Sequence, residues 1–217
     1  MLKLAGPKAK ASIDYSYASV RQAAARALAQ GWRSEAQPIL RDWVRNHEDA
    51  YSRIAVLRTI AESLHDDPTT LPVLQDRATN DLTAQMRSAA LQTIAEGWGG
   101  NAQMLAFLQE RATNDPGAEV RLATLRAIAE GWGGWRDDAQ ALPFLQERAT
   151  NDSEAEVRSA ALRAIAEGWR GDAQALPFLQ ERATNDPGAE VRSAALWAIG
   201  RHWRGNAQAL AFLQEHL

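Results

Sequence analysis

Histidine and acidic side chains are the groups in this sequence that could serve as metal ligands or as general acids and bases. The four histidines are His47, His65, His202 and His216. None of them belongs to a metal-ligand pair of the HExxH kind. The chain has no cysteine, which excludes thiolate zinc sites, disulfide bonds and cysteine nucleophiles. Glycine pairs follow predicted helices without a preceding strand, so they do not form a phosphate-binding loop. We therefore expect no enzyme activity, no metal and no cofactor.

The remaining acidic residues recur along the chain instead of converging on one site. Glu147, Glu156 and Glu167 have counterparts in other parts of the sequence. An active site needs unlike residues that come together once, whereas the same charge at every step is typical of solvated helix faces. The informative feature of the sequence is therefore the repetition of its elements, and not any single residue.

One phrase of eleven residues occurs four times. LPFLQERATND begins at Leu142 and again at Leu176, LAFLQERATND begins at Leu105, and LPVLQDRATND begins at Leu71. The intervals are 34, 37 and 34 residues, and we assign the longer one to three extra residues around Trp135 to Asp137. A period of this length is typical of solenoids and other repeat arrays.

Each unit is predicted to contain a long second helix. In the unit that begins at Leu142, the stretch from Glu156 to Trp169 is dense in Ala, Leu, Glu and Arg, which are strong helix formers. Its polar residues Ser159, Arg163 and Glu167 recur every four positions and form a narrow stripe. A helix with so narrow a polar face must be covered on several sides.

A shorter first helix precedes it, over residues 143–150, with Leu142, Leu145 and Ala149 on its inner face. Asn-Asp and Asp-Pro-Gly sequences separate the two helices, and Gly-Trp sequences end the second one. No segment alternates apolar and polar residues over the length of a strand. The tetratricopeptide signature is also absent, although its period is 34 residues.

An aspartate and an arginine six residues apart mark the turn into each second helix. The pairs are Asp81 and Arg87, Asp115 and Arg121, Asp152 and Arg158, and Asp186 and Arg192. This pattern resembles the HEAT repeat, in which the two residues form a ladder between neighbouring repeats. The short unit and its Gly-Trp ending are similar to bacterial, especially cyanobacterial, HEAT-like repeats, including the phycobilisome-lyase type and arrays fused to signalling NTPases. The resemblance runs from about Ser12 to Leu217. His47 occupies the aspartate position of the preceding unit, so we expect a weaker ladder there.

The resemblance implies an all-α fold, a right-handed α-solenoid of helix-turn-helix repeats of about 34 residues. We predict a flexible N-terminal arm over residues 1–11, carrying Lys3, Lys8 and Lys10. A single solenoid domain over residues 12–217 follows, with a final half-repeat at 208–217. This prediction contains six first helices and six second helices.

The recurring tryptophans are predicted to pack between repeats. They are Trp32, Trp98, Trp132, Trp169 and Trp203. Trp135 is expected on a loop, where anchoring a partner and packing over the widened joint stay equally open.

In HEAT arrays the second helices usually line the concave surface, so we predict a partner-binding stripe there. Its residues are Leu122, Arg126, Glu130, Ser159, Arg163, Glu167, Trp197 and Arg201. Trp197 and Arg201 replace Arg163 and Glu167 of the preceding unit. Tryptophan and arginine are enriched at interface hot spots. Two interpretations of Trp197 stay open, partner binding and capping of the last half-repeat.

Composition limits the partners. The formal net charge is −3. The stripe pairs arginine with a glutamate four residues on at Arg126 and Glu130 and at Arg163 and Glu167, which cancels the charge that nucleic acid would require. No uncharged apolar run approaches the roughly 18 residues of a membrane span. We predict a cytoplasmic, monomeric protein-interaction scaffold. The alternatives are a nucleic-acid-binding HEAT-like protein and a HEAT-like lyase or chaperone that acts on a chromophore protein.

Overall fold

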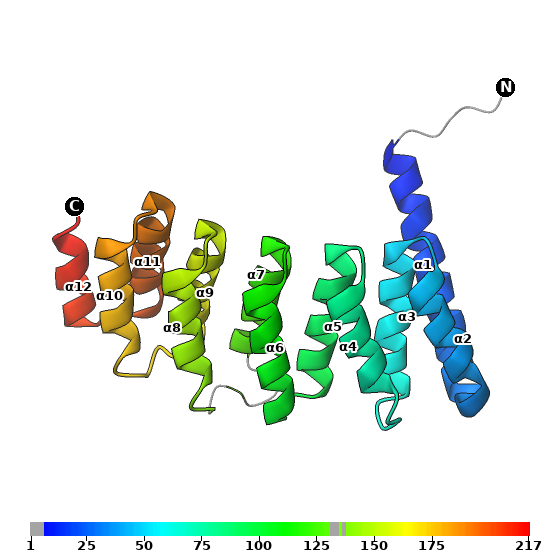
Figure 1. The fold of residues 1–217 in the computed structure, drawn as a ribbon. Helices are drawn as coiled ribbons and strands as arrows, with labels where there is room; N and C mark the ends of the chain where they lie inside the picture. The colour runs from blue at the N-terminus through cyan, green and yellow to red at the C-terminus, as the bar shows by residue number, and fades with distance from the viewer. Residues whose placement is uncertain (1–6, 131–134, 136–137) are drawn as a thin grey trace. The chain divides into compact units, whose positions relative to one another are not determined.

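The computed structural model describes the backbone of residues 7–130, 135 and 138–217, and side chains from residue 19 onward within those ranges. These residues form twelve α-helices and no strand (Figure 1). The helices are α1 (Pro7–Gly31), α2 (Arg33–Asn46), α3 (Ala50–Ser63), α4 (Thr70–Asn80), α5 (Ala84–Gly97), α6 (Ala102–Asn114), α7 (Ala118–Glu130), α8 (Ala141–Asn151), α9 (Ala155–Gly168), α10 (Ala175–Asn185), α11 (Ala189–His202) and α12 (Ala207–Gln214). The all-α prediction is confirmed.

The helices group into two compact units, residues 1–97 and residues 98–217, where the sequence predicted one continuous domain. The N-terminal unit contains α1 to α5, and the C-terminal unit contains α6 to α12. Helix α1 begins at Pro7, inside the segment that was predicted to be a flexible arm, while residues 1–6 lie outside the described part.

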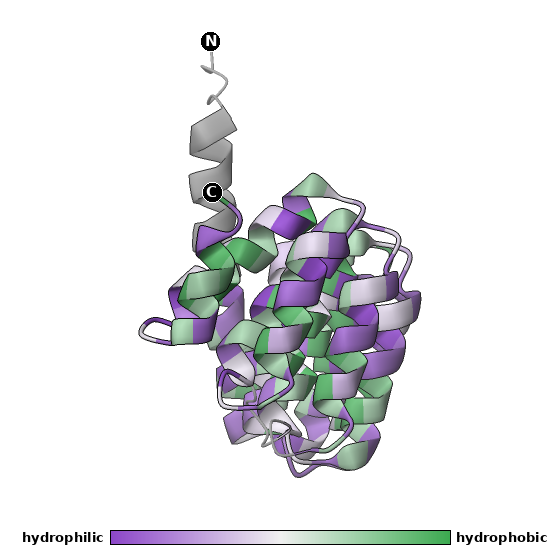
Figure 2. Ribbon diagram, turned by 90° about the vertical axis from the view of Figure 1, so that its left-hand side faces the viewer, coloured by the Kyte–Doolittle hydropathy of each residue, from purple (hydrophilic) through white to green (hydrophobic). Residues whose placement is uncertain are grey.

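In the C-terminal unit each first helix packs against the second helix that follows it. These hairpins are α6 with α7, α8 with α9, and α10 with α11. The second helices α7, α9 and α11 also pack in a row, so α9 has neighbours on both sides as well as its own first helix. Helix α9 accordingly buries eight of its fourteen residues, including Val157, Leu162 and Ile165. The helices that face the viewer in Figure 2 combine hydrophobic and hydrophilic residues.

Each turn from a first to a second helix is built on an aspartate. Asp152 ends α8, and its Oδ1 accepts a hydrogen bond from the backbone N–H of Glu154 at 3.0 Å. Arg158, six residues on, donates from Nη1 to the backbone carbonyl of Asp152 at 2.9 Å. The same two kinds of contact occur at Asp81 with Arg87, at Asp115 with Arg121, and at Asp186 with Arg192.

The arginine of one repeat also binds the aspartate of the next. Arg121 meets Asp152 through two parallel hydrogen bonds of 3.0 and 3.1 Å, and both side chains are buried. Arg158 binds Asp186 with the same two distances. Such bidentate contacts between an arginine and a carboxylate fix both distance and orientation. In the N-terminal unit, Arg53 binds Asp81 at 2.9 Å.

Electrostatics at Asp186 reflect this pairing. Burial alone would raise the pKa of its carboxyl group, but the hydrogen bonds from Arg158 and Gly188 and the charges of Arg158 and Arg182 hold that pKa below its ordinary value. In the same way, the hydrogen bonds to Asp152 raise the pKa of Arg121. Asp186 and Arg121 therefore favour their charged forms although they are buried.

The ladder is looser at the first step of the N-terminal unit, where His47 replaces the aspartate. Asp49 supplies the carboxylate instead and caps α3 through the N–H groups of Tyr51 and Ser52. Arg21 lies 3.7 Å from this carboxylate, and both side chains are about one-third exposed (34% and 33%). Arg53 keeps its backbone contact, donating to the carbonyl of His47 at 2.8 Å.

Replacing Asp152 by alanine tests the ladder. The change leaves Arg121 buried without its carboxylate and removes the hydrogen bond to Glu154, so we expect a loss of about 3–5 kcal/mol in the free energy of unfolding. The control is Glu62→Gln, which breaks the exposed pair between Arg26 and Glu62 and should cost less than about 1 kcal/mol. Urea denaturation followed by circular dichroism measures both. Equal losses would contradict a stabilising role for the buried ladder.

Candidate interaction surface

The second helices of the C-terminal unit share a row of exposed side chains, which we call the second-helix stripe. It consists of Arg126 and Glu130 on α7, Arg163 and Glu167 on α9, and Trp197 and Arg201 on α11. On each helix the two residues are four apart, and thus one turn apart on one face. Between them lie mostly buried alanines, such as Ala127 and Ala129, which pack inward.

A groove of about 320 Å³ lies between α7 and α9. Its lining consists of Arg126, Ala129, Glu130, Ala160, Arg163, Ala164 and Glu167. Within the described residues, none of its four charged side chains forms a hydrogen bond or an ion pair. The groove therefore carries two positive and two negative side chains that are not paired with one another. All four charges are available to a partner.

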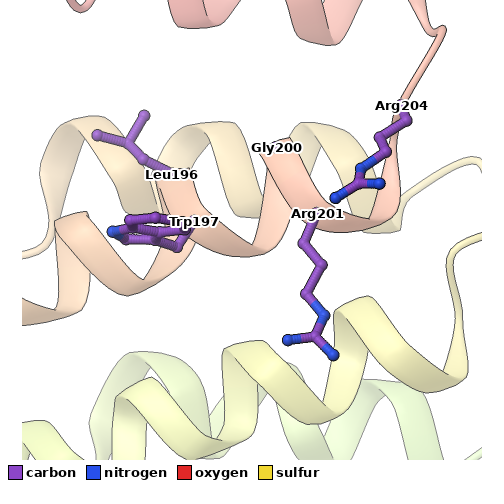
Figure 3. A pocket seen from close by; sticks show the side chains of 5 residues that line it. All are labelled: Leu196, Trp197, Gly200, Arg201 and Arg204. Atoms are coloured by element: carbon purple, nitrogen blue, oxygen red, sulfur yellow. The ribbon is translucent and has the colours of Figure 1, made fainter.

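The last second helix carries the most exposed tryptophan of the described residues. Trp197 is 80% exposed. Together with Leu196, Gly200, Arg201 and Arg204 it lines a surface depression of about 500 Å³ (Figure 3). A side chain this exposed does not cover α12, which argues against the capping interpretation.

Two residues of the predicted stripe are less exposed than the other six. Ser159 is only 5% exposed, which corrects its assignment to the partner-binding surface. The cause is its neighbour α11: the equivalent Ser193, on a helix that no further second helix follows within the described chain, is exposed. Leu122 is half-buried on α7.

The recurring tryptophans differ in burial. Trp169 is buried, and Trp98 and Trp203 are half-buried, as packing between repeats requires. Trp32 is 60% exposed, so the prediction of core packing is wrong there. Helix α2 starts directly after Trp32, whereas residues 170–174 connect Trp169 to the next helix, so the ring of Trp32 is placed differently. Trp132 lies outside the described residues.

Trp135 takes the position that the sequence assigned to Trp132. Its side chain is 1% exposed, and its carbonyl accepts a hydrogen bond from the N–H of Asp138 at 3.1 Å. In the following repeat, the carbonyl of Trp169 accepts one from Asp172 at 2.8 Å. Trp135 is therefore the packing tryptophan of its repeat, and of the two interpretations left open, packing at the joint is the one its burial favours.

A signal for this assignment was present in the sequence. Residues 134–141 read GWRDDAQA, and residues 168–175 read GWRGDAQA, so seven of eight positions agree. This alignment moves the three extra residues from 135–137 to 131–133. Two Gly-Trp pairs follow one another here, and the second one aligns with Gly168 and Trp169.

His202 lies at the end of α11 beside the stripe. Burial lowers the pKa of its imidazole below the ordinary value, and the charges of Arg201 and Arg170 lower it further, while Glu167 opposes the shift. The lowered pKa favours the neutral form near pH 7. The sister repeat has Gly168 at this position, so this titratable group is particular to α11.

The second helices of the N-terminal unit also carry charged residues at the positions equivalent to the stripe. Arg26 of α1 donates to Glu62 of α3 at 2.7 Å, an ion pair between two neighbouring second helices. A groove of about 330 Å³ lies between α3 and α5, where the Nε2 of His65 is 2.8 Å from the carbonyl oxygen of Gly97. Here part of the surface charge is paired within the protein.

Metal-binding and membrane-spanning features are not found in the part of the chain that the structure describes. Among those residues, no three His, Asp or Glu side chains come together in a way that could hold a metal ion. No described helix combines the length and the apolar character needed to cross a bilayer.

The fold and this surface define the protein as an α-helical repeat protein, an array of helical hairpins joined by a buried ladder of charges. The family model described as HEAT repeats matches residues 11–95, 86–166, 105–200 and 142–217. The chain belongs to this family. Among curated proteins, none matches this chain.

Trp135 and Trp197 provide a matched pair of truncations. We expect Trp135→Ala to lower the free energy of unfolding by about 3–5 kcal/mol, because it empties a buried site. Trp197→Ala should change that free energy by less than about 0.5 kcal/mol, since the ring is exposed. Urea denaturation of both variants distinguishes them. A large loss for Trp197→Ala would mean that its ring has a structural role.

His202 predicts a specific dependence of stability on pH. Its folded-state pKa is lowered, so the unfolded chain binds the proton more readily. The contribution of His202 is fully present above the unfolded pKa of about 6.5 and is lost as pH falls below it toward the folded pKa. We expect His202→Gln to reduce the loss of stability between about pH 7 and pH 5.5. Denaturation curves with the same pH dependence in both proteins would contradict this.

Proposed function

We propose that the protein is a non-catalytic scaffold that binds a protein partner along the second-helix stripe. HEAT repeats generally mediate protein–protein interaction. The observation that carries the proposal is Trp197, an 80% exposed indole at a position where α7 and α9 have arginine. Tryptophan and arginine are the types most enriched at interface hot spots, and here Arg201 follows one turn later.

The rest of the stripe supports a protein partner over nucleic acid. Glu130 and Glu167 lie beside Arg126 and Arg163 in the groove between α7 and α9. Phosphate groups would approach two carboxylates there, whereas a protein can present charges of both signs. The concave placement of the stripe, a monomeric state and a cytoplasmic location stay predictions.

Affinity capture from a lysate of the source organism, with and without nuclease, tests this proposal. The bait variant carries Trp197→Ala and Arg201→Glu, two exposed positions whose replacement leaves the core intact. The matched control carries Tyr51→Ala and Leu82→Ala, which are exposed apolar residues of the N-terminal unit. We expect a nuclease-resistant protein that the bait variant loses and the control keeps.

Two results would contradict the proposal. A partner retained by the bait variant would place binding elsewhere on the molecule. Recovery of nuclease-sensitive material alone would favour the nucleic-acid alternative.

A further inference from the structure

Helix α11 reverses the sign of charge at one position of the stripe. Glu62, Glu96, Glu130 and Glu167 occupy this position on α3, α5, α7 and α9, but α11 has Arg201. Arg204 follows within the same depression, which has no carboxylate in its lining (Figure 3). This end of the stripe is therefore locally cationic, although the chain as a whole carries a formal charge of −3.

In the N-terminal unit an acidic residue at this position forms an ion pair with the preceding second helix, whereas the equivalent Arg126 and Glu167 of α7 and α9 form none within the described residues. The N-terminal pair joins Arg26 of one second helix to Glu62 of the next at 2.7 Å. The equivalent residues on α9 and α11 are Arg163 and Arg201, so two arginines occupy the positions of an ion pair. Two guanidinium groups repel each other, and an anion supplied from outside would restore the balance.

Arg201 on α11 and Arg204, just after the end of that helix, are free to accept such an anion. Within the described residues, neither Arg201 nor Arg204 forms a hydrogen bond or an ion pair, and both are exposed. A guanidinium binds a carboxylate through two parallel hydrogen bonds, so each arginine can hold one acidic side chain.

An apolar surface adjoins these charges. The exposed ring of Trp197 and the half-buried Leu196 lie one turn before Arg201. Position 200 is a glycine, whereas the preceding repeat has Ala166 at this position, so no side chain lies here between the apolar residues and Arg201. A Cβ atom at Gly200 would lie 3.7 Å from Leu213 Cδ1, which is an ordinary contact distance. The depression thus offers room for an aromatic or aliphatic side chain next to the cationic groups.

We propose that Trp197, Arg201 and Arg204 bind an acidic peptide segment of the partner, with an aromatic or aliphatic residue flanked by carboxylates. This inference rests on the proposed protein-binding function and names the chemistry of the partner at the α11 end of the stripe. A peptide suits the site better than a nucleic acid because the cationic character ends at Glu167, on the neighbouring helix.

Fluorescence anisotropy with labelled synthetic peptides tests the proposal on the whole protein. The probe carries glutamates on both sides of one phenylalanine, and its comparisons have lysine in place of glutamate or alanine in place of phenylalanine. We expect the glutamate–phenylalanine peptide to bind in a salt-dependent manner. The lysine peptide should bind at least about tenfold more weakly, which corresponds to about 1.4 kcal/mol.

Variants assign the binding to the site. Arg201→Glu and Arg204→Glu should each weaken binding about tenfold or more, because each places a carboxylate where the peptide has one. Arg33→Glu makes the same change of net charge on an exposed residue of the N-terminal unit and should leave the affinity within about twofold. Trp197→Ala should weaken binding of the phenylalanine peptide more than binding of the alanine peptide.

Several outcomes would overturn the inference. They are equal binding of glutamate and lysine peptides, equal effects of Arg33→Glu and Arg201→Glu, and tighter binding of a single-stranded oligonucleotide that Arg201→Glu abolishes. Failure of every peptide, while a captured protein is still lost with the Trp197 and Arg201 variant, would reject acidic recognition and leave the scaffold function standing. Failure of both experiments would reject both proposals.

Discussion

The buried contact between an arginine and an aspartate of the next repeat is the constraint on which the rest of the structure depends. Arg121 with Asp152 and Arg158 with Asp186 place opposite charges in the interior of the C-terminal unit. A buried charge without its partner is strongly destabilising, so a hairpin can stack only in the register that brings the two groups together. The same aspartate holds the turn of its own repeat, which couples local structure to packing.

This constraint explains why the units resemble one another and where they are free to differ. The ladder, the small alanines and the apolar residues of the inner faces must recur, because within each unit a hairpin packs on the one before it. The exposed positions of the second helices carry no such requirement. Arg163 and Trp197 occupy the same position of two second helices that share a buried valine, two buried alanines and a buried isoleucine at equivalent positions. Differences at these positions are therefore informative about binding.

The sequence predicted what the repeats have in common and failed where the place of a residue in the array matters. The helix pattern and the aspartate–arginine pairs recur in unit after unit, so the sequence alone predicts them. Ser159 and Ser193 have the same local sequence, yet only Ser159 is buried, because another second helix packs against α9. The prediction of core packing for Trp32 is wrong for a related reason, because α2 follows Trp32 directly, whereas several residues connect Trp169 to the next helix. For Trp135 the sequence alone permits the correct alignment with Trp169, but two adjacent Gly-Trp pairs allow two alignments.

In α11, the residues that pack in the core and the residues proposed to bind a partner lie on different sides of the same helix. Val191, Ala195 and Ile199 are buried and hold it in the core, while Trp197 and Arg201 face away. Replacing an exposed residue typically changes stability by less than about 0.5 kcal/mol, whereas a core truncation costs several times as much. A repeat built this way can change the sign of a charge or add an indole on its outer face without losing its register. The reversal from Glu167 to Arg201 between two otherwise similar helices is a change of that kind, and we expect it to affect the proposed binding more than folding.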